Sequence, residues 1–406
     1  MRRRAKILVL TSTFPRRAAD AEPGFVMALC ARLAEEFDVH VLAPHAPGAA
    51  RSEVLDGIAV TRYRYAPVRW ERLAYDGGIL ANLRRRPWLA ALVPLLVGAQ
   101  IGAAARLLRR GRYDLIHAHW LLPQGFAAVL ATRLARRSIP VVCTAHGGDW
   151  FALRGRIAMA FKRWALRRVD ILTVVSRAME EAVRRDGTVP KRLEIVPMGT
   201  DLARRFTPPP APRGAGIELL FVGRLVEKKG LEHLLRALPE ILRFRPETKL
   251  TVAGRGPEEG RLRDLAARLG LGADIRFLGA VPHGELPALF RRATLFVAPF
   301  VVASGGDQEG FGLVLVEALG CECPVLTSDL PAVRDIVIPE RTGVLVPPGD
   351  PRALAEAAIS LLADPERRHR LASAGRRHVR AHFSWEASGA HYRRILREAI
   401  GGAGGE

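Results

Sequence analysis

Residues 207–214 read Thr-Pro-Pro-Pro-Ala-Pro-Arg-Gly and divide the chain into two halves. Proline lacks a backbone N–H and fixes its own φ, so this stretch can continue neither a helix nor a sheet ladder. We therefore predict a stiff linker over residues 207–216. One domain is expected on each side of it, over residues 1–206 and 217–383.

Each half alternates short apolar runs with helical patterns. The runs lie at residues 7–10, 39–42, 115–117, 141–143 and 171–175, and then at 219–222, 250–253, 275–278, 295–298 and 325–327. This alternation predicts an α/β fold with two doubly wound parallel sheets, each covered by helices on both faces. Because such sheets bind ligands at the carboxyl ends of their strands, we expect a site between the domains. The amphipathic segment 384–400 is expected to cross back onto the first domain.

The composition is that of a globular protein with an anionic partner. The 406 residues are 49% hydrophobic and 25% charged, and 62 Lys and Arg against 41 Asp and Glu give a net charge of +21. Arginine supplies nearly all of the positive charge, so the adjacent lysines Lys228 and Lys229 are unusual. An ammonium group is a compact point charge for phosphate, which makes Lys229 a candidate ligand.

Neither a disulfide framework nor a metal is expected, and no cofactor either. The four cysteines are too few for a framework in so long a chain, and Cys321-Glu-Cys323 lacks the spacing of a zinc site. The uncharged stretch 88–105 is interrupted by Pro94, Gly98, Gln100 and Gly102, so we predict no membrane-spanning helix there. A cytoplasmic location is expected, either free or at the inner face of the cell membrane.

The sequence Gly306-Asp-Gln-Glu-Gly-Phe-Gly-Leu-Val-Leu-Val-Glu317 leads through glycines into an apolar helix. A helix start of this kind offers unpaired N–H groups and a positive dipole end to a phosphate, here at Gly310, Phe311, Gly312 and Leu313. Glu309 lies before the helix, where it can meet a ligand, and Glu317 lies inside it, where it can accept from two neighbouring hydroxyls. A sugar nucleotide presents the hydroxyls of its sugar, its diphosphate and its ribose in this order, which matches the order of these groups along the sequence.

Three further loops of the second half follow predicted strands. Gly223-Arg-Leu-Val-Glu-Lys-Lys-Gly230 places two cations at a helix start, which suits a diphosphate, although a solvated basic loop has the same composition. Gly254 permits close approach of the backbone to a ligand. Val281 and His283 end another strand and could serve a nucleotide base, or form an ordinary turn.

In the first half, Thr144-Ala-His-Gly-Gly-Asp149 follows a buried strand. A lone histidine is usually structural, but the glycines, the strand end and Asp149 favour a functional role for His146. His117 and His119 share a strand face without a third metal ligand, so acceptor contact or packing is expected. Gly24, in the first βα turn, either brings backbone N–H groups to a phosphate or acceptor or belongs to a plain loop.

Two stretches of the first half are rich in cations and free of acids. Seven arginines lie between Asp76 and Asp114, and six cations lie between Asp149 and Asp170, interleaved with apolar side chains. This pattern suits an anionic membrane surface, with solvated helix faces as the alternative. No nucleic-acid-binding motif accompanies the charge, so no nucleic acid partner is expected.

In combination, these motifs resemble a retaining glycosyltransferase of family 4, which has the GT-B fold of two Rossmann-like domains. The resemblance rests on Glu309 and Glu317, on residues 223–230, and on residues 146–149. It implies a UDP- or GDP-sugar as donor and a lipid-linked or polysaccharide acceptor. The alternatives are a nucleotide-sugar epimerase of the same fold and a non-catalytic polyanion-binding protein.

The resemblance also implies a role for each site residue. Arg224 and Lys229 would neutralise the donor diphosphate without a metal. His146 would lie beside the sugar and its phosphate, and Asp149 would also contact the donor. Glu309 would meet the sugar and Glu317 would hold the ribose, while the region 281–283 would contact the base. The first loop departs from the pattern, because many relatives carry a Gly-Gly pair where this chain has only Gly24 after Pro23.

Overall fold

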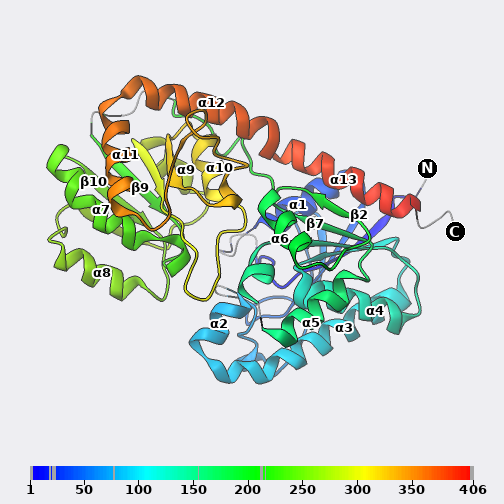
Figure 1. The fold of residues 1–406 in the computed structure, drawn as a ribbon. Helices are drawn as coiled ribbons and strands as arrows, with labels where there is room; N and C mark the ends of the chain where they lie inside the picture. Colours follow the sequence, from blue (N-terminus) through cyan, green and yellow to red (C-terminus); the bar gives the residue numbers. More distant parts are fainter. Residues whose placement is uncertain are drawn as a thin grey trace. The chain divides into compact units, whose positions relative to one another are not determined.

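The computed structural model describes residues 3–17, 20, 24–75, 78–153, 155–210, 214 and 216–402, so residues 21–23 of the first loop, residues 211–213 and 215 of the predicted linker and the last four residues lie outside it. The chain forms two compact units (Figure 1). The first contains Met1–Val175, Met179–Gly199 and Ser388–Glu406, and the second contains Ser176–Ala178 and Thr200–Ala387.

An eight-stranded sheet forms the centre of the first unit, in the order β3-β4-β2-β1-β5-β6-β7-β8. Its strands are β1 (Lys6–Leu10), β2 (Asp38–Pro44), β3 (Ser52–Leu55), β4 (Ile58–Tyr63), β5 (Leu115–His119), β6 (Val141–Ala145), β7 (Ile171–Val174) and β8 (Leu193–Ile195). The predicted parallel sheet is confirmed except at its edge, where β3 and β4 pair antiparallel. The turn between them is Asp56-Gly57, and both residues have positive φ, as a two-residue hairpin requires.

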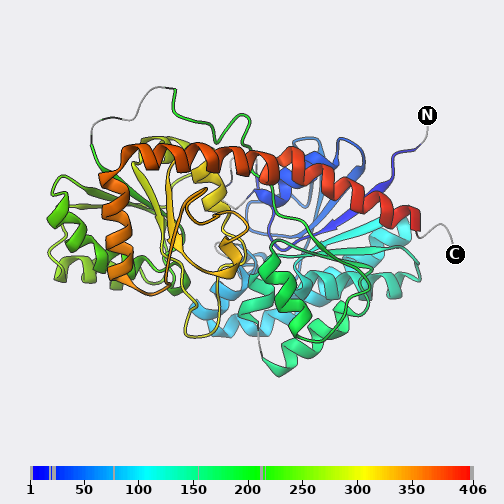
Figure 2. The ribbon, with the colours of Figure 1, turned by 45° about the horizontal axis from the view of Figure 1, so that its top comes forward.

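Helices cover both faces of this sheet. They are α1 (Phe25–Leu33), α2 (Ile79–Arg85), α3 (Leu92–Arg110), α4 (Phe126–Ala135), α5 (Arg156–Leu166), α6 (Arg177–Arg185) and the C-terminal α13 (Trp385–Gly402). Figures 1 and 2 show α3, α4 and α5 on one face and α1 with α13 on the other. The C-terminal helix is fixed there by ion pairs from Arg393 to Glu35 and from Arg192 to Glu398, both at 2.7 Å.

Helix α3 is continuous, so Pro94, Gly98, Gln100 and Gly102 interrupt the apolar composition of this stretch without breaking the helix. Pro94 lies in the first turn, where its missing N–H would have no partner anyway. Within the described residues, the helical stretch Pro87–Arg110 meets the length and composition of a membrane span, with a third of its apolar window buried. Helix α3 packs against α4, and its buried residues include Leu92, Leu96 and Gln100.

The second unit is built on a six-stranded parallel sheet in the order β11-β10-β9-β12-β13-β14. Its strands are β9 (Glu218–Val222), β10 (Lys249–Ala253), β11 (Ile275–Gly279), β12 (Leu295–Ala298), β13 (Val325–Ser328) and β14 (Val344–Val346). Its helices are α7 (Leu231–Phe244), α8 (Glu259–Arg268), α9 (Leu286–Arg292), α10 (Leu313–Gly320), α11 (Pro351–Ala363) and α12 (Pro365–Phe383). Helix α7 packs against α8 and α11, and α10 packs against α9 and α12.

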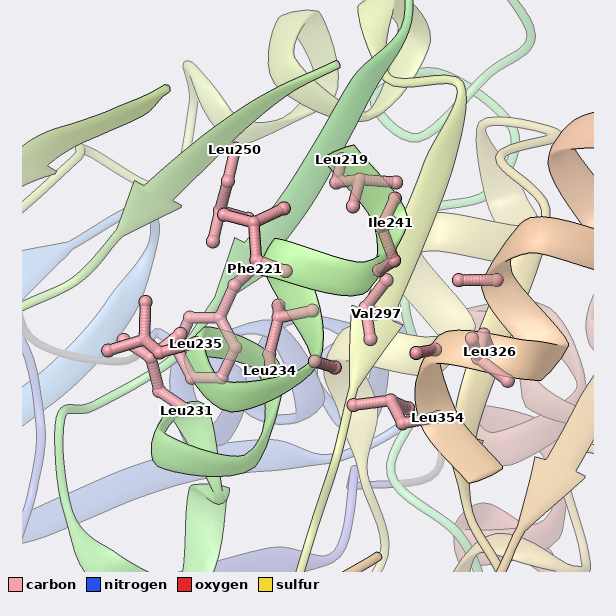
Figure 3. Packing of buried hydrophobic residues seen from close by; sticks show 14 of the residues in the cluster. Leu219, Phe221, Leu231, Leu234, Leu235, Ile241, Leu250, Val297, Leu326 and Leu354 are labelled. Carbon is pink, nitrogen blue, oxygen red and sulfur yellow. The ribbon is translucent and has the colours of Figure 1, made fainter. Parts of the chain in front are cut away.

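The core of the second unit lies between α7 and the sheet (Figure 3). Leu231, Leu234, Leu235 and Ile241 recur at helical spacing on α7 and are all buried, next to Phe221 of β9. The helix runs to Phe244 and passes through Pro239. Burial of Ile241 beyond the proline offsets the hydrogen bond that Pro239 cannot make.

The expected domain boundary at residue 206 differs from the one in the structure, because Thr200–Phe206 belongs to the second unit. Leu202 and Phe206 are buried and lie against Gly320, where an added Cβ would meet the Leu202 side chain at 2.5 Å. Arg291 of α9 also donates to the carbonyl oxygen of Thr207 at 2.8 Å. This packing joins the segment to the second unit before the proline-rich stretch begins.

Candidate active site

Two loops at the carboxyl edge of the second sheet are bonded to each other through three consecutive side chains of the first loop. Loop 223–230 follows β9, and loop 299–312 follows β12, its neighbour in the sheet. Glu227 accepts from the backbone N–H of Ser304 at 2.7 Å, Lys228 pairs with Asp307 at 3.0 Å, and Lys229 pairs with Glu309 at 2.7 Å. The structure thus brings the predicted Lys229 and Glu309 together, and it adds Asp307 and Ser304, which the sequence did not indicate.

The Glu309 carboxylate is held by three donors. Its Oε2 accepts from Lys229 Nζ, and its Oε1 accepts from the backbone N–H groups of Gly310 at 3.1 Å and Phe311 at 3.4 Å. Burial acts to raise the pKa of this carboxyl, but the charges of Lys229 and Lys228 outweigh it and bring the pKa to about 2. Glu309 is therefore a fixed negative charge at neutral pH and a weak base.

Lys229 is positioned by the residues around its stem and ammonium group. Its Nζ lies 4.6 Å from the centre of the Phe300 ring, and a Cβ added at Gly223 would lie 3.6 Å from its Cδ. An ammonium over a ring face is stabilised by the ring quadrupole. Arg224, the other predicted cation, is exposed in the same loop.

Two glycines allow the loops of this edge to approach one another. A Cβ at Gly254 would lie 1.8 Å from the carbonyl oxygen of Gly223, and φ there is +147°. At Gly230 the corresponding distance to the carbonyl oxygen of Pro299 is 1.7 Å, with φ of +68°. The glycine at 254 is thus required for packing against loop 223–230, and its predicted close approach to a ligand stays a prediction.

Helix α10 begins at the expected place. Gly312 is its N-cap with φ of +93°, and Leu313 is its first residue. Its first turn contains no acid, so the positive end of its dipole is not offset within the helix. Phe311 is buried and stacks edge-on with Phe383 at 5.5 Å, so its side chain has a packing role and only its backbone lies with the site.

Glu317, one turn further along α10, pairs with His283, which was predicted to contact the nucleotide base. The Nε2 of His283 lies 2.8 Å from Glu317 Oε1, and its Nδ1 lies 3.2 Å from a guanidinium nitrogen of Arg205. Since a carboxylate only accepts and a guanidinium only donates, His283 carries its proton on Nε2. His283, expected to contact the nucleotide base, therefore bonds to Glu317, which is expected to hold the ribose. Val281, the other residue expected at the base, is half-buried.

The first unit places His146 at the carboxyl end of β6 in an aromatic setting. The rings of Phe25, Trp120 and His119 have centroids 5.1, 4.9 and 5.2 Å from the ring of His146. His119 and the neighbouring His117 are fully buried, with ring centroids 4.5 Å apart. These two histidines pack in the core, and the described residues contain no cluster of three or more side chains that could hold a metal ion.

Asp149 holds the loop that carries His146. Its carboxylate accepts from the backbone N–H of Leu121 at 2.6 Å and from that of His146 at 3.1 Å. Both oxygens are thus bonded to the protein, and the direct donor contact predicted for Asp149 stays a prediction. At Gly24 φ is −82° and an added Cβ would meet no atom within 4 Å, so neither its backbone conformation nor its surroundings require glycine.

The low pKa values of His117 and His146 predict a loss of stability in mild acid. Burial lowers the pKa of His117 and of His146 to about 3, the latter with a contribution from His117. Below about pH 6.5 the unfolded chain takes up these protons and the folded chain does not, so stability falls as pH falls from 6.5 towards 3. Between pH 7.5 and 5.5 each such histidine should lower the free energy of unfolding by about 1.4 kcal/mol.

Urea unfolding of the wild type and of His117→Leu at both pH values measures this contribution. The variant should lose about 1.4 kcal/mol less than the wild type over this interval, whatever its stability at pH 7.5. The exposed His369 offers a matched control, and His369→Gln should keep the wild-type dependence. An unchanged dependence in His117→Leu would contradict the neutral, buried state of His117.

Comparisons with known proteins agree with this architecture. The family model described as Glycosyltransferase Family 4 matches residues 25–204, and that described as Glycosyl transferases group 1 matches residues 208–378. A glycogen synthase of Mycobacterium tuberculosis is 34% identical over 71% of this chain and 70% of its own. A GDP-mannose-dependent monoacylated alpha-(1-6)-phosphatidylinositol monomannoside mannosyltransferase of Corynebacterium glutamicum is 31% identical over 80% of this chain and 86% of its own.

Solved structures show the same fold. Sucrose-phosphate synthase from Thermosynechococcus elongatus has a TM-score of 0.78 at 25% identity, covering 98% of this chain and 100% of its own. Anabaena HepE in complex with UDP and glucose has a TM-score of 0.74 at 19% identity, covering 97% and 100%. The two parallel-sheet units thus define an enzyme of the glycosyltransferase class with the GT-B fold. The chain belongs to glycosyltransferase family 4.

Proposed function

We propose that this enzyme transfers a hexose from a UDP- or GDP-sugar to a lipid-linked or polysaccharide acceptor with retention of anomeric configuration. The observation that carries the donor side is the pairing of Lys229 with Glu309 beside the start of α10. Relatives support a nucleotide-sugar donor, because one is a GDP-mannose-dependent mannosyltransferase and another is a glycogen synthase. We propose that no metal takes part, since the cations of loop 223–230 supply the charge.

The arrangement separates the two charges that develop when a sugar leaves a diphosphate. Negative charge grows on the departing phosphate, and Lys229, Arg224 and the amino end of α10 provide a positive field for it. Positive charge grows on the sugar ring, and the fixed carboxylate of Glu309 provides a negative field. Both fields exist before the ligand binds, so little reorganisation is needed during the reaction.

Glu309 is better suited to this electrostatic role than to covalent attack. Its two oxygens already accept from one ammonium and two backbone N–H groups, and its low pKa makes it a poor nucleophile. Retaining glycosidases that form a covalent intermediate use a second carboxylic acid about 5–5.5 Å away. The neighbouring Asp307 is engaged by Lys228 at 3.0 Å. We therefore favour same-face attack, in which the leaving phosphate takes the proton of the acceptor.

A thermal-shift screen of UDP- and GDP-sugars tests the donor assignment. Binding at a concentration of one hundred times Kd stabilises the folded protein by about 2.7 kcal/mol, which corresponds to a rise in Tm of about 5–10 °C. We expect one nucleotide class to give this rise and to release its nucleoside diphosphate when an acceptor is added. If no UDP- or GDP-sugar raises Tm or is consumed, the proposal fails.

We also propose that the first unit works on an anionic membrane surface. Trp88 and Leu95, at the start of the Pro87–Arg110 stretch, are 56% and 54% exposed, and the exposed Arg84, Arg85 and Arg86 immediately precede them. On α5, on the same face of the sheet, the exposed Ile157 and Phe161 lie one turn apart among further arginines. Apolar side chains flanked by cations are the pattern of interfacial helices.

Flotation with vesicles of anionic and of zwitterionic lipid measures this binding. A juxtamembrane arginine contributes about 1 kcal/mol at an anionic surface, so Arg84→Ala/Arg85→Ala should weaken binding about 30-fold. Arg370→Ala/Arg377→Ala, on the exposed side of α12, is the matched control and should bind like the wild type. Equal flotation of all three proteins, or none with either lipid, would contradict the membrane proposal.

A further inference from the structure

Two ring nitrogens of the buried histidines have no partner among the residues that the structure describes. They are Nδ1 of His117 and Nε2 of His119. The other nitrogen of each ring is bonded, since His117 Nε2 lies 2.8 Å from Thr144 Oγ1 and His119 Nδ1 lies 3.0 Å from His146 Nε2. Each ring thus has one bonded and one unbonded nitrogen in the core.

The unbonded nitrogens decide where the protons lie. A buried N–H without an acceptor is rarer in proteins than an acceptor with an unused lone pair. Burial also lowers the pKa of both histidines, so each ring is neutral and carries one proton. The proton therefore belongs on the bonded nitrogen, which is Nε2 in His117 and Nδ1 in His119.

The threonines beside His117 give an independent check. The Thr173 hydroxyl donates to the carbonyl oxygen of Cys143 at 3.5 Å, and its oxygen lies 2.7 Å from that of Thr144. If Thr173 donates to the carbonyl, Thr144 must donate to Thr173, and Thr144 must then accept from His117. This order requires the proton of His117 on Nε2, in agreement with its unbonded Nδ1.

We propose that His119 is a positioning residue that donates from Nδ1 to Nε2 of His146 and thereby fixes the proton of His146 on Nδ1. Within the described residues, no hydrogen bond engages Nδ1 of His146, and this ring is half-buried whereas that of His119 is fully buried. Nδ1 is thus the ring atom available to a ligand, and it is a donor. This step rests on the proposed function only in its choice of ligand, which is an oxygen acceptor of the nucleotide sugar, either a phosphate or a sugar hydroxyl.

The consequence is that His146 donates a hydrogen bond and does not act as a base through this atom. Its lone pair is occupied by His119, and its own low pKa disfavours uptake of a second proton. A donor fixed in advance stabilises growing negative charge on an oxygen without reorganisation. The contact between His119 and His146 would therefore act on the chemical step more than on substrate binding.

Nitrogen NMR of the full-length protein labelled with 15N-histidine tests the proton positions directly. The spectra of His146→Gln and His119→Asn, compared with that of the wild type at pH 7.5, assign the two rings. We expect the Nδ1–H tautomer for both His146 and His119. A wild-type spectrum in which His146 carries its proton on Nε2, or on both nitrogens, would overturn the proposal, as would an Nε2–H tautomer of His119 bonded to an internal water.

Kinetics of two variants test the positioning role. His119→Leu removes the donor and should lower kcat about 10- to 100-fold with KM within about threefold. His119→Asn places an amide near the former Nδ1 and should retain most of the activity. Equal losses in both variants would indicate a packing role alone. If the leucine variant fails to fold, the wild-type NMR spectrum still tests the proton positions of His119 and His146. The same spectrum tests them if the protein shows no transfer activity, so failure of the proposed function and failure of this proposal can be told apart.

Discussion

Replacing Lys229 by alanine is expected to lower kcat for sugar transfer about 10²- to 10³-fold. The ammonium is the cation of loop 223–230 that lies 2.7 Å from Glu309 and over the Phe300 ring, so its position is set before a ligand binds. Its loss removes a preorganised charge from the departing diphosphate. It also leaves the Glu309 carboxylate without its counter-ion, which adds repulsion towards a phosphate.

A double variant separates these two contributions. In Lys229→Ala/Glu309→Gln both charges are absent, so repulsion from Glu309 is removed. If the lysine acts on the phosphate itself, the double variant should be slower than Glu309→Gln alone. Lys249→Ala is a matched control, since Lys249 pairs with Asp274 at the opposite, amino end of the sheet, and it should keep kcat within about twofold. Wild-type kcat in Lys229→Ala would refute the assignment of the donor site.

Gly254→Ala is expected to destabilise the second unit strongly. The new Cβ would lie 1.8 Å from a backbone oxygen of Gly223, and φ of +147° is unfavourable for any residue with a Cβ. Backbone cannot rotate away as a side chain can, so the loops after β9 and β10 must separate. We expect a loss of about 4 kcal/mol or more, seen as a fall in Tm of about 10 °C, together with loss of donor binding.

Gly260→Ala provides the matched control in the same unit. Gly260 is the second residue of α8, and an added Cβ there meets no atom within 4 Å. Alanine is favoured over glycine in a helix, so this variant should gain about 0.5–1 kcal/mol. Calorimetry of both variants checks the pair. A Tm of Gly254→Ala within 2 °C of the wild type would show that the two loops do not approach as closely as described.

Most strands could be predicted from the sequence because their apolar runs are buried on both faces of a parallel sheet. The strands that were missed lack this signal. Strands β8 and β14 have only three residues each, and β8 is only half-buried. The hairpin of β3 and β4 was also missed, although Asp56-Gly57 is a recognisable two-residue turn signal.

The candidate site was predictable as a set of loops but not as a set of contacts. Glycines and charges at strand ends indicated residues 223–230 and 309–317, since parallel strands bring their carboxyl ends to one edge. The partners of Glu227 and Lys228 lie almost eighty residues away, and the sequence contains no rule that matches them. The same holds for His283, whose bond to Glu317 depends on the turn after β11 and on Arg205 from a segment that was assigned to the first domain.

The first unit combines most of residues 1–199 with the C-terminal helix α13, and this arrangement affects the order in which the chain folds during translation. Tyr392 of α13 is fully buried, its ring lies 5.6 Å from that of His117, and its hydroxyl donates to the carbonyl oxygen of Val196. A fragment ending at residue 199 would lack this cover over its sheet. During synthesis on the ribosome, we therefore expect residues 1–199 to stay incompletely packed until α13 has been translated. The second unit, whose sequence is nearly contiguous, is free to fold first.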